Sequence, residues 1–387
     1  MTAVPERSHL RLLQLAALTS TCDRFAIAPL LVVIAADLDV TLAAAAGVAS
    51  GYFLAYGLMQ PVWGVVSDRL GRVRVMRLAL LAAVAAGVGS ALAPDLLTLG
   101  ITRVLAGGSF AALFPTSLVY VGDSWPVEGR QRPLSDVLAA SSVGVAAATA
   151  GAGVLADLAG WRVVPALTAA GGAALWFALA RLPEPVRETS TGRPLRSAAA
   201  VLRHRPARAV LALAFVEGAV VLAPLTYTAV AVQSLGASAT VAGFVAAAFG
   251  VGAVVWSRWV RALVGRVGSA GLAGIGGAFL VVGWALVAVA LTPVTVAVAA
   301  FAVGGSWAFL HSTLQTWITE VVPGERATAV ALFASALFLG SAAGTALAAP
   351  LADAGAFPTL FRVALAAAVP LAVAAALARR RHGRARR

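Results

Sequence analysis

The stretch GVVSDRLGRVR, from Gly64 to Arg74, decides the fold. It sets arginines and an aspartate between two long runs that consist almost entirely of Leu, Ala, Val and Gly. Charge of this density requires water, whereas the flanking runs favour an apolar surrounding. The stretch therefore marks a place where the chain leaves one apolar segment and enters another.

Composition extends this pattern to the whole chain. The 387 residues are 60% hydrophobic and 12% charged, and their mean hydropathy is +0.91. Soluble domains carry about 25% charged residues. Most polar residues here lie in short gaps between apolar runs of roughly 20 residues, the length of a helix that crosses a bilayer. We therefore expect a polytopic membrane protein.

The residue types that are absent exclude several functions. The chain has no lysine, so it cannot contain the phosphate-binding loop of an ATP-driven pump. With one cysteine, Cys22, and four histidines, it offers neither a nucleophile with a base nor a metal-ligand set. We expect no enzyme activity, no cofactor and no metal.

The apolar runs predict an all-α integral membrane protein with 12 transmembrane helices in two pseudo-symmetric six-helix halves. We expect an N-terminal half at 1–182, a cytoplasmic linker at 183–206, a C-terminal half at 207–379 and a polybasic cytoplasmic tail at 380–387. The predicted spans are 11–36, 45–66, 74–93, 96–121, 135–157, 162–182, 207–232, 240–261, 269–291, 293–319, 327–350 and 358–379.

The arginines predict the orientation. Arg24 and Arg103 fall within spans and Arg162 and Arg362 near one face, while all other arginines fall on the opposite face. Under the positive-inside rule that face is cytoplasmic, and both chain ends lie there. The arginine and alanine bias indicates a GC-rich bacterial genome, so we expect the bacterial inner (plasma) membrane.

The two halves resemble each other. APLL at 28–31 recurs as APLT at 223–226, and AAGVASGYF at 45–53 aligns with VAGFVAAAF at 241–249. Parallel six-helix halves of this kind form a transporter architecture that binds its substrate near the membrane midplane, between the halves. Pro29 and Pro224 occupy equivalent positions and are candidate hinges.

In this topology the opening stretch resembles the signature loop of the major facilitator superfamily, G-x-x-x-D-R-x-G-R-R/K. The resemblance covers the whole chain and implies a 12-span transporter similar to the drug/proton antiporter-like bacterial exporters. It also implies that the loop gates transport by latching the halves together in one state. The alternative is that its arginines only set topology. The residues assigned to this gating loop are Gly64, Asp68, Arg69, Gly71 and Arg72.

Span five departs from the antiporter pattern. In the antiporter branch a Gly-Pro pair precedes the turn that is present here as Gly160, Trp161 and Arg162. The corresponding positions hold Ala148 and Thr149. The departure weakens the inference of proton antiport and leaves the predicted fold unchanged.

Ionisable residues within spans are functional candidates because a charge in the bilayer is costly. Asp23 and Arg24 lie in span one, Arg103 in span four and Glu217 in span seven. Since Asp23 and Arg24 are adjacent, one of them faces the cavity while the other reaches a partner helix. Arg103 is a candidate counter-ion for Asp23 or Glu217. We expect these carboxylates to couple transport to protons; the alternative is a static ion pair.

Polar and aromatic residues at helical spacing suggest the lining of a substrate cavity. In two spans they recur every four residues and so share a face. They suit an apolar or amphipathic substrate, although ordinary helix packing is nearly as good an explanation of the tyrosines, and His311 is as well explained as a hydrogen-bonded packing residue. These residues are Tyr52, Tyr56 and Gln60 in span two, and Trp307, His311 and Gln315 in span ten.

These features predict a secondary active transporter that exports a small amphipathic or drug-like compound by proton-coupled alternating access. The alternative is an uptake symporter or facilitator of a sugar or organic acid, and a non-transporting receptor is disfavoured because we find no soluble domain. The expected partners are a small-molecule substrate, protons and the lipid bilayer. We expect no nucleic-acid partner and a monomer.

Overall fold

A computed structural model describes residues 7–126, 128–185 and 194–384. In these residues the regular structure is helical, and the one β-interaction is an isolated bridge between Val264 and Val267. Eleven helices are long and apolar enough to cross a membrane, and Val163–Leu179 adds a shorter apolar helix. The predicted all-α membrane fold is confirmed.

The N-terminal half contains six spans, two of which are interrupted. Their ends differ from the predicted ones by only a few residues. The elements are α1 (Arg7–Phe25), η1 (Ala28–Leu30) and α2 (Leu31–Asp37), which make one interrupted span; α3 (Leu42–Leu70); α4 (Arg72–Ala91); α5 (Leu96–Phe110) and α6 (Leu113–Ser124), which make another; α7 (Gln131–Ala159); and α8 (Val163–Leu179).

The C-terminal half repeats this arrangement after a short helix, α9 (Pro194–Arg203), within the expected linker. The final helix extends into the expected tail, whose last residues, 385–387, lie outside the described residues. The elements are α10 (Arg205–Glu217), η2 (Gly218–Leu222) and α11 (Ala223–Ser234); α12 (Ala239–Leu263); α13 (Ser269–Val289); α14 (Pro293–Ser306), η3 (Trp307–His311) and α15 (Ser312–Val321); η4 (Pro323–Glu325); α16 (Arg326–Asp353); and α17 (Phe357–Arg384).

The first and fourth spans of each half are interrupted near the middle of their length. Span one passes through a turn and the 3₁₀ segment η1, which contains Pro29, and span four breaks between Phe110 and Leu113. In the second half the equivalent interruptions are the π-helical segments η2 and η3. Such interruptions are common at functional sites and in the discontinuous helices of transporters. Four interrupted spans therefore mark the middle of the molecule.

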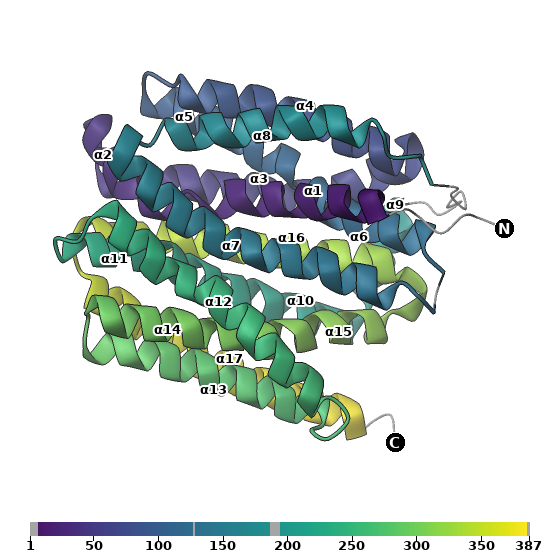
Figure 1. Cartoon of the computed structure of the whole chain (residues 1–387). Coiled ribbons are helices and arrows are strands. Elements are labelled where there is room, and N and C mark those ends of the chain that lie inside the picture. Colours follow the sequence, from purple (N-terminus) through teal and green to yellow (C-terminus); the bar gives the residue numbers. More distant parts are fainter. Residues whose placement is uncertain (1–6, 127, 186–193, 385–387) are drawn as a thin grey trace.

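The two halves lie side by side, and both chain ends lie at the same end of the molecule (Figure 1). Helix α16 packs on α3 and α12 packs on α7, so each of these contacts joins one half to the other. Glycines allow close approach: a Cβ on Gly153 of α7 would lie 2.2 Å from the carbonyl oxygen of Ala239, and one on Gly243 would lie 2.4 Å from that of Thr149. Close packing of this type is how helices associate in lipid.

Two aspartates join the halves at the far end, which we define as the end opposite both chain termini. Asp157, near the end of α7, accepts hydrogen bonds from the backbone nitrogens of Ala239 (3.2 Å) and Thr240 (2.8 Å) at the start of α12. Asp353, at the end of α16, accepts one from the nitrogen of Ala43 (3.1 Å) at the start of α3. The pairs are related by the internal repeat, because the aspartates have the same separation in sequence as the helix starts that they contact. We call them the far-end clasps.

Removal of both clasps is expected to loosen the far end. A carboxylate at a helix N-terminus contributes roughly 0.3–2 kcal/mol, so Asp157→Ala with Asp353→Ala shifts the equilibrium toward a state that is open at this end. Spin labels on Val40→Cys and Leu235→Cys, in a Cys22→Ser background, measure the separation of the halves. The double aspartate variant should show a longer and broader distance distribution than its parent. An unchanged distribution would show that the clasps do not hold this end closed.

Candidate functional site

Asp23 and Arg103 form a buried ion pair between the first and fourth spans. The two guanidinium nitrogens Nη1 and Nη2 donate to Oδ1 and Oδ2 of Asp23, each at 2.9 Å. Thr168 of α8 donates a further hydrogen bond to Oδ1 at 3.2 Å, and the ring of Tyr52 lies 4.7 Å from Cζ of Arg103. The pair is thus bidentate and sequestered. Of the two partners that the sequence allowed for Arg103, the structure has Asp23.

The interruption of span one helps to place this pair. Arg103 Nη2 also donates to the backbone carbonyl of Asp23 at 3.1 Å. This carbonyl lies in the last turn of α1, where carbonyls lack a partner within the helix. Within a bilayer such a group must be satisfied by the protein. Arg103 therefore neutralises the Asp23 carboxylate and also satisfies the backbone carbonyl that the interruption of the helix leaves without a partner.

Glu217 and His311 form the corresponding pair between the seventh and tenth spans. The distance between Nδ1 of His311 and Oε2 of Glu217 is 3.1 Å, and Glu217 is fully buried. Its other oxygen, Oε1, has no hydrogen-bond partner among the described residues. The His311 ring stacks on Trp307, with centroids 3.7 Å apart and an angle of 7° between the rings. Glu217 directly precedes η2 and His311 ends η3, so both interruptions converge on this pair.

The two pairs join corresponding spans of the two halves, but Arg103 and His311 lie at different positions along their spans, and the pairs differ in chemistry. Arginine keeps its charge in proteins, and a bidentate carboxylate–guanidinium pair is held in a fixed geometry. A carboxylate–histidine pair has no such permanently charged partner. The two pairs therefore differ in whether the basic partner is always charged.

Arg24 takes a different environment from its neighbour Asp23. Its guanidinium carbon lies 5.0 Å from the centres of the rings of Phe25 and Tyr56 and 5.1 Å from that of Phe338. The residue borders a cavity between the two halves that encloses about 390 Å³ of empty space, including the space at its open end. Asp23 thus reaches a partner helix while Arg24 faces a cavity.

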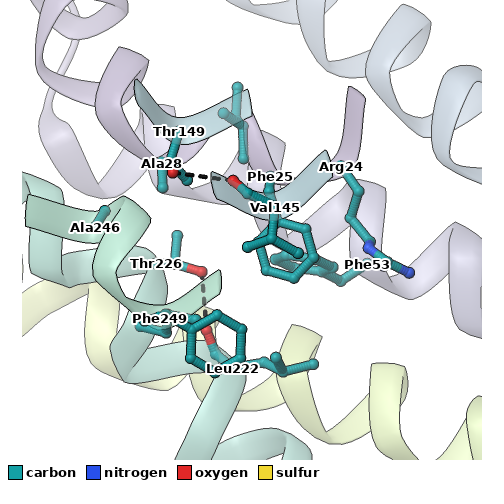
Figure 2. A pocket seen from close by; sticks show the side chains of 12 residues that line it. Arg24, Phe25, Ala28, Phe53, Val145, Thr149, Leu222, Thr226, Ala246 and Phe249 are labelled. Atoms are coloured by element: carbon teal, nitrogen blue, oxygen red, sulfur yellow. Dashed lines mark hydrogen bonds between the residues drawn. The ribbon is translucent and has the colours of Figure 1, made fainter. Parts of the chain in front are cut away.

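Apolar side chains from both halves dominate the lining of this cavity. Figure 2 shows Arg24 at one edge, beside Phe53. The hydroxyl groups of the two threonines in the lining are both used within their own helices: Thr149 donates to the carbonyl of Val145 and Thr226 to that of Leu222. The remaining lining residues are Phe25, Ile27, Ala28, Val145, Leu222, Leu225, Ala246 and Phe249.

The predicted cavity residues lie close to this site but mostly pack within the protein. Tyr52, Tyr56 and Gln60 of α3 are buried, and the hydroxyl groups of both tyrosines have no partner among the described residues. Trp307 and His311 stack against each other, and Gln315 is half-buried on α15. The rings of Tyr56 and Tyr52 on α3 contact the guanidinium groups of Arg24 and Arg103, respectively. Neither tyrosine nor Gln60 lines the cavity of Figure 2.

The signature stretch is mostly helical, contrary to the expected loop. Helix α3 continues to Leu70 and α4 begins at Arg72, so the connection is Gly71 alone, with φ +116°. Gly64 lies inside α3, and a Cβ there would meet nothing within 4 Å. Asp68 and Arg69 lie in the last turn of α3. The helix stops at Gly71, which adopts a conformation that is unfavourable for other residues.

Arg72 is the centre of the contacts at this connection. Its Nε donates to Asp123 at 2.8 Å, and Nη1 donates to Ser67 at 3.0 Å and to Asp68. Its own backbone nitrogen donates to Glu184. The motif thus ties the ends of α3, α4 and α6 together with the first residues after α8. These contacts lie within the N-terminal half and are not the expected latch between the halves.

The carboxylate at the N-terminus of α4 is that of Glu184. It accepts hydrogen bonds from the backbone nitrogens of Val73 (3.2 Å) and Arg74 (3.4 Å) as well as Arg72. A Cβ on Gly71 would lie 2.7 Å from the Glu184 carboxyl carbon, which is a second reason for glycine at that position. Sequence reasoning missed Glu184 because it lies in a polar segment more than a hundred residues away. It also missed Asp123 and Thr168, for which the only signal was position at a span end or within a span.

The sequence matches the profile of the family described as Major Facilitator Superfamily over residues 13–345. This chain belongs to the Major Facilitator Superfamily. The resemblance drawn from the signature stretch is therefore confirmed, and the protein is a transporter and not an enzyme. Its family carries small-molecule substrates across membranes.

Two curated relatives are called triacylglyceride transporters. The one from Mycolicibacterium smegmatis is 31% identical over 133 residues, which are 34% of this chain and 24% of that relative. The one from Mycobacteroides abscessus is 35% identical over 97 residues, 25% of this chain and 19% of that relative. In these matches the chain spans about a quarter or less of the relatives' length.

Solved structures of other major facilitators share the fold. The nucleoside transporter NupG superimposes with a TM-score of 0.80 at 14% identity, over 96% of this chain and 99% of that one. A bacterial homologue of the human lysosomal transporter Spinster, solved in an inward-facing and unoccupied conformation, gives 0.76 at 19% identity, over 97% and 98%. At this identity the likeness shows the architecture alone.

The two charge pairs predict unequal effects on stability. Asp23→Asn leaves the Arg103 charge buried without a counter-charge, and breaking a buried pair from one side costs roughly 3–5 kcal/mol. Glu217→Gln leaves a histidine that is able to stay neutral, so its cost should be smaller. Thermal unfolding of the purified variants in detergent should give a markedly lower Tm for Asp23→Asn than for Glu217→Gln. Equal Tm values would contradict the fixed character of the N-terminal pair.

Alanine substitutions at the two glycines of the signature stretch are expected to change the Tm in different ways. Gly71→Ala places a Cβ against Glu184 and forces a positive φ on alanine, so it should lower the Tm. Gly64→Ala is the matched control, because it enters open space inside a helix, where alanine is favoured over glycine by up to about 1 kcal/mol. It should leave the Tm unchanged or raise it slightly. A neutral Gly71→Ala would show that neither the conformation nor the Glu184 contact matters.

Proposed function

We propose that this major facilitator exports a small amphipathic organic compound in exchange for protons, by alternating access between its two halves. The observation that carries the proposal is the buried Glu217–His311 pair, placed where two interrupted spans meet. Glu217 has one oxygen on the imidazole and one without a partner among the described residues. A proton added to this pair removes a net negative charge from a buried site.

The proton belongs to the pair in this scheme and not to either residue. With a neutral imidazole and an ionised carboxylate the pair carries a charge of minus one, and uptake of one proton makes it neutral overall. Asp23, held by the permanent charge of Arg103, keeps the N-terminal half rigid while the C-terminal pair cycles.

The gating residues act in this scheme through the connection at Gly71. We propose that Arg72 and Asp68, with Arg69 beside them, hold the end of the molecule that bears the chain termini in one of its two states. The far-end clasps of Asp157 and Asp353 are engaged in the present state. The positive-inside distribution supports a far end on the outside, both termini in the cytoplasm and a bacterial inner membrane. Two halves complete one pathway, which supports a monomer.

The cavity favours an amphipathic substrate over a sugar. Sugars require several hydrogen-bonding groups, whereas the threonine hydroxyl groups in this lining are already used by their own helices. Uptake or facilitated passage of an organic acid is the alternative, and the direction of flux separates the two.

Proton movement in proteoliposomes tests the proposal. The purified protein is reconstituted with an entrapped pH-sensitive dye, and lipophilic compounds of either charge are added on one side. Compound movement should drive proton movement in the opposite direction. Glu217→Gln should abolish this signal while retaining exchange of labelled for unlabelled compound, and Glu128→Gln, which changes an exposed carboxylate, should match the wild type.

Three outcomes would overturn the proposal or part of it. Compound flux without proton movement would identify a facilitator. Protons and compound moving in the same direction would identify a symporter. Coupling lost in Asp23→Asn but kept in Glu217→Gln would move the proton site to the N-terminal half.

A further inference from the structure

Arg24 differs from the other buried arginines in its partners. Arg72, Arg103 and Arg379 each have a carboxylate oxygen within 2.8–2.9 Å. Arg24 is 8% exposed, and the structure gives it neither a hydrogen bond nor an ion pair to any described residue. A buried charge ordinarily needs a counter-charge because its loss of hydration is not otherwise compensated.

The carboxylates of the neighbouring spans are already engaged. Asp23 is held in a bidentate pair with Arg103, and Glu217 faces His311. The rings around Arg24 attract its cation, but they carry no net charge. The counter-charge is therefore not supplied by these groups.

The surroundings of Arg24 combine one positive charge with an extended apolar surface. Phe25, Phe53 and Phe249 line the same cavity, together with aliphatic side chains from both halves (Figure 2). The ring of Tyr56, which flanks the guanidinium, carries a buried hydroxyl without a partner among the described residues. A ligand with one anionic group would thus find a cation and a nearby phenol at one end of an apolar cavity.

We propose that this cavity, once it widens during alternating access, binds amphiphiles that carry a single anionic group, with the anion on Arg24 and the apolar body against Phe25, Phe53 and Phe249. This inference rests on the proposed function insofar as the cavity is the transport cavity. It narrows the substrate class from amphipathic compounds in general to amphipathic anions. A single unpaired arginine matches one negative charge and does not match a multiply charged phosphate compound.

A matched pair of ligands tests the charge preference without any variant. 1-Octanesulfonate is anionic at all relevant pH values, and 1-octanesulfonamide has nearly the same shape and is neutral near pH 7. Their Kd values are measured by calorimetry on the protein in nanodiscs of zwitterionic lipid, with empty nanodiscs as the blank. The wild type should bind the sulfonate at least tenfold more tightly. Equal Kd values, or tighter binding of the sulfonamide, would overturn the proposal.

Variants then assign the preference to Arg24. Arg24→Gln should remove the discrimination between the two ligands, and Arg24→Lys, which keeps the charge but loses the planar fork, should retain part of it. Arg362→Gln, at an exposed arginine far from the cavity, is the matched control and should behave as the wild type. Retention of the full preference in a folded Arg24→Gln protein, judged by size-exclusion chromatography, would overturn the assignment.

Failure here and failure of the proposed function are distinguishable. The binding measurement requires no transport and no proton movement. An anion preference without proton-coupled flux would support this site in a facilitator, and proton-coupled flux of neutral or cationic compounds without an anion preference would support the exporter and refute the anionic class.

Discussion

The structure depends on one constraint: inside a bilayer, each broken backbone hydrogen bond must be satisfied by the protein itself. Four spans are interrupted at mid-length, and each interruption needs such compensation. Arg103 satisfies a carbonyl at the end of α1 in addition to the Asp23 carboxylate. In the other half the buried indole of Trp284 donates to the carbonyl of Val220 within η2, at 2.9 Å. The polar groups at the centre therefore hold the interruptions in place as well as forming a site.

The internal duplication has been kept in some places and altered in others. At the far end Asp157 and Asp353 make equivalent contacts, so the symmetry there is nearly complete. At the centre each half has its own buried pair, carboxylate–arginine in the first and carboxylate–histidine in the second, and the arginine and the histidine are not at repeat-equivalent positions. At the signature connection only the first half has an aspartate, since Gly265 occupies the corresponding region of the second. The two halves thus differ more at the centre and at the signature connection than at the far end.

Much of the fold was predictable because hydropathy and arginine placement act over whole spans. The ends of the spans were predicted to within a few residues. The positions of Asp23 and Arg103 well inside their spans indicated that each buried charge needs an oppositely charged partner. The contact between Glu217 and His311 was harder, because an isolated histidine in an apolar run is equally compatible with packing. The π-helical segments leave no mark in hydropathy, since one additional residue per turn does not change composition.

Contacts made by polar residues at span ends were the least predictable. Asp157, Asp353 and Glu184 look like ordinary solvated carboxylates in the sequence, and their function depends on which helix start lies beside them. For the two aspartates one signal was available: their separation equals the offset between the repeats. For Glu184 none was available, because its role depends on the return of the chain beside α4 after three further spans.

The Glu184 contact has a consequence for how the polypeptide is divided. The residue follows α8 and belongs in sequence to the connection between the halves, yet its carboxylate closes the first turn of α4. If the gene were divided before Glu184, the N-terminal fragment would contain α4 but lack the carboxylate that accepts hydrogen bonds from its first backbone N–H groups. Glu184 would then belong to the C-terminal fragment. A split after this residue would leave the acid in the fragment that contains α4. The N-terminal half, as this contact defines it, therefore extends beyond the point at which its sixth membrane crossing ends.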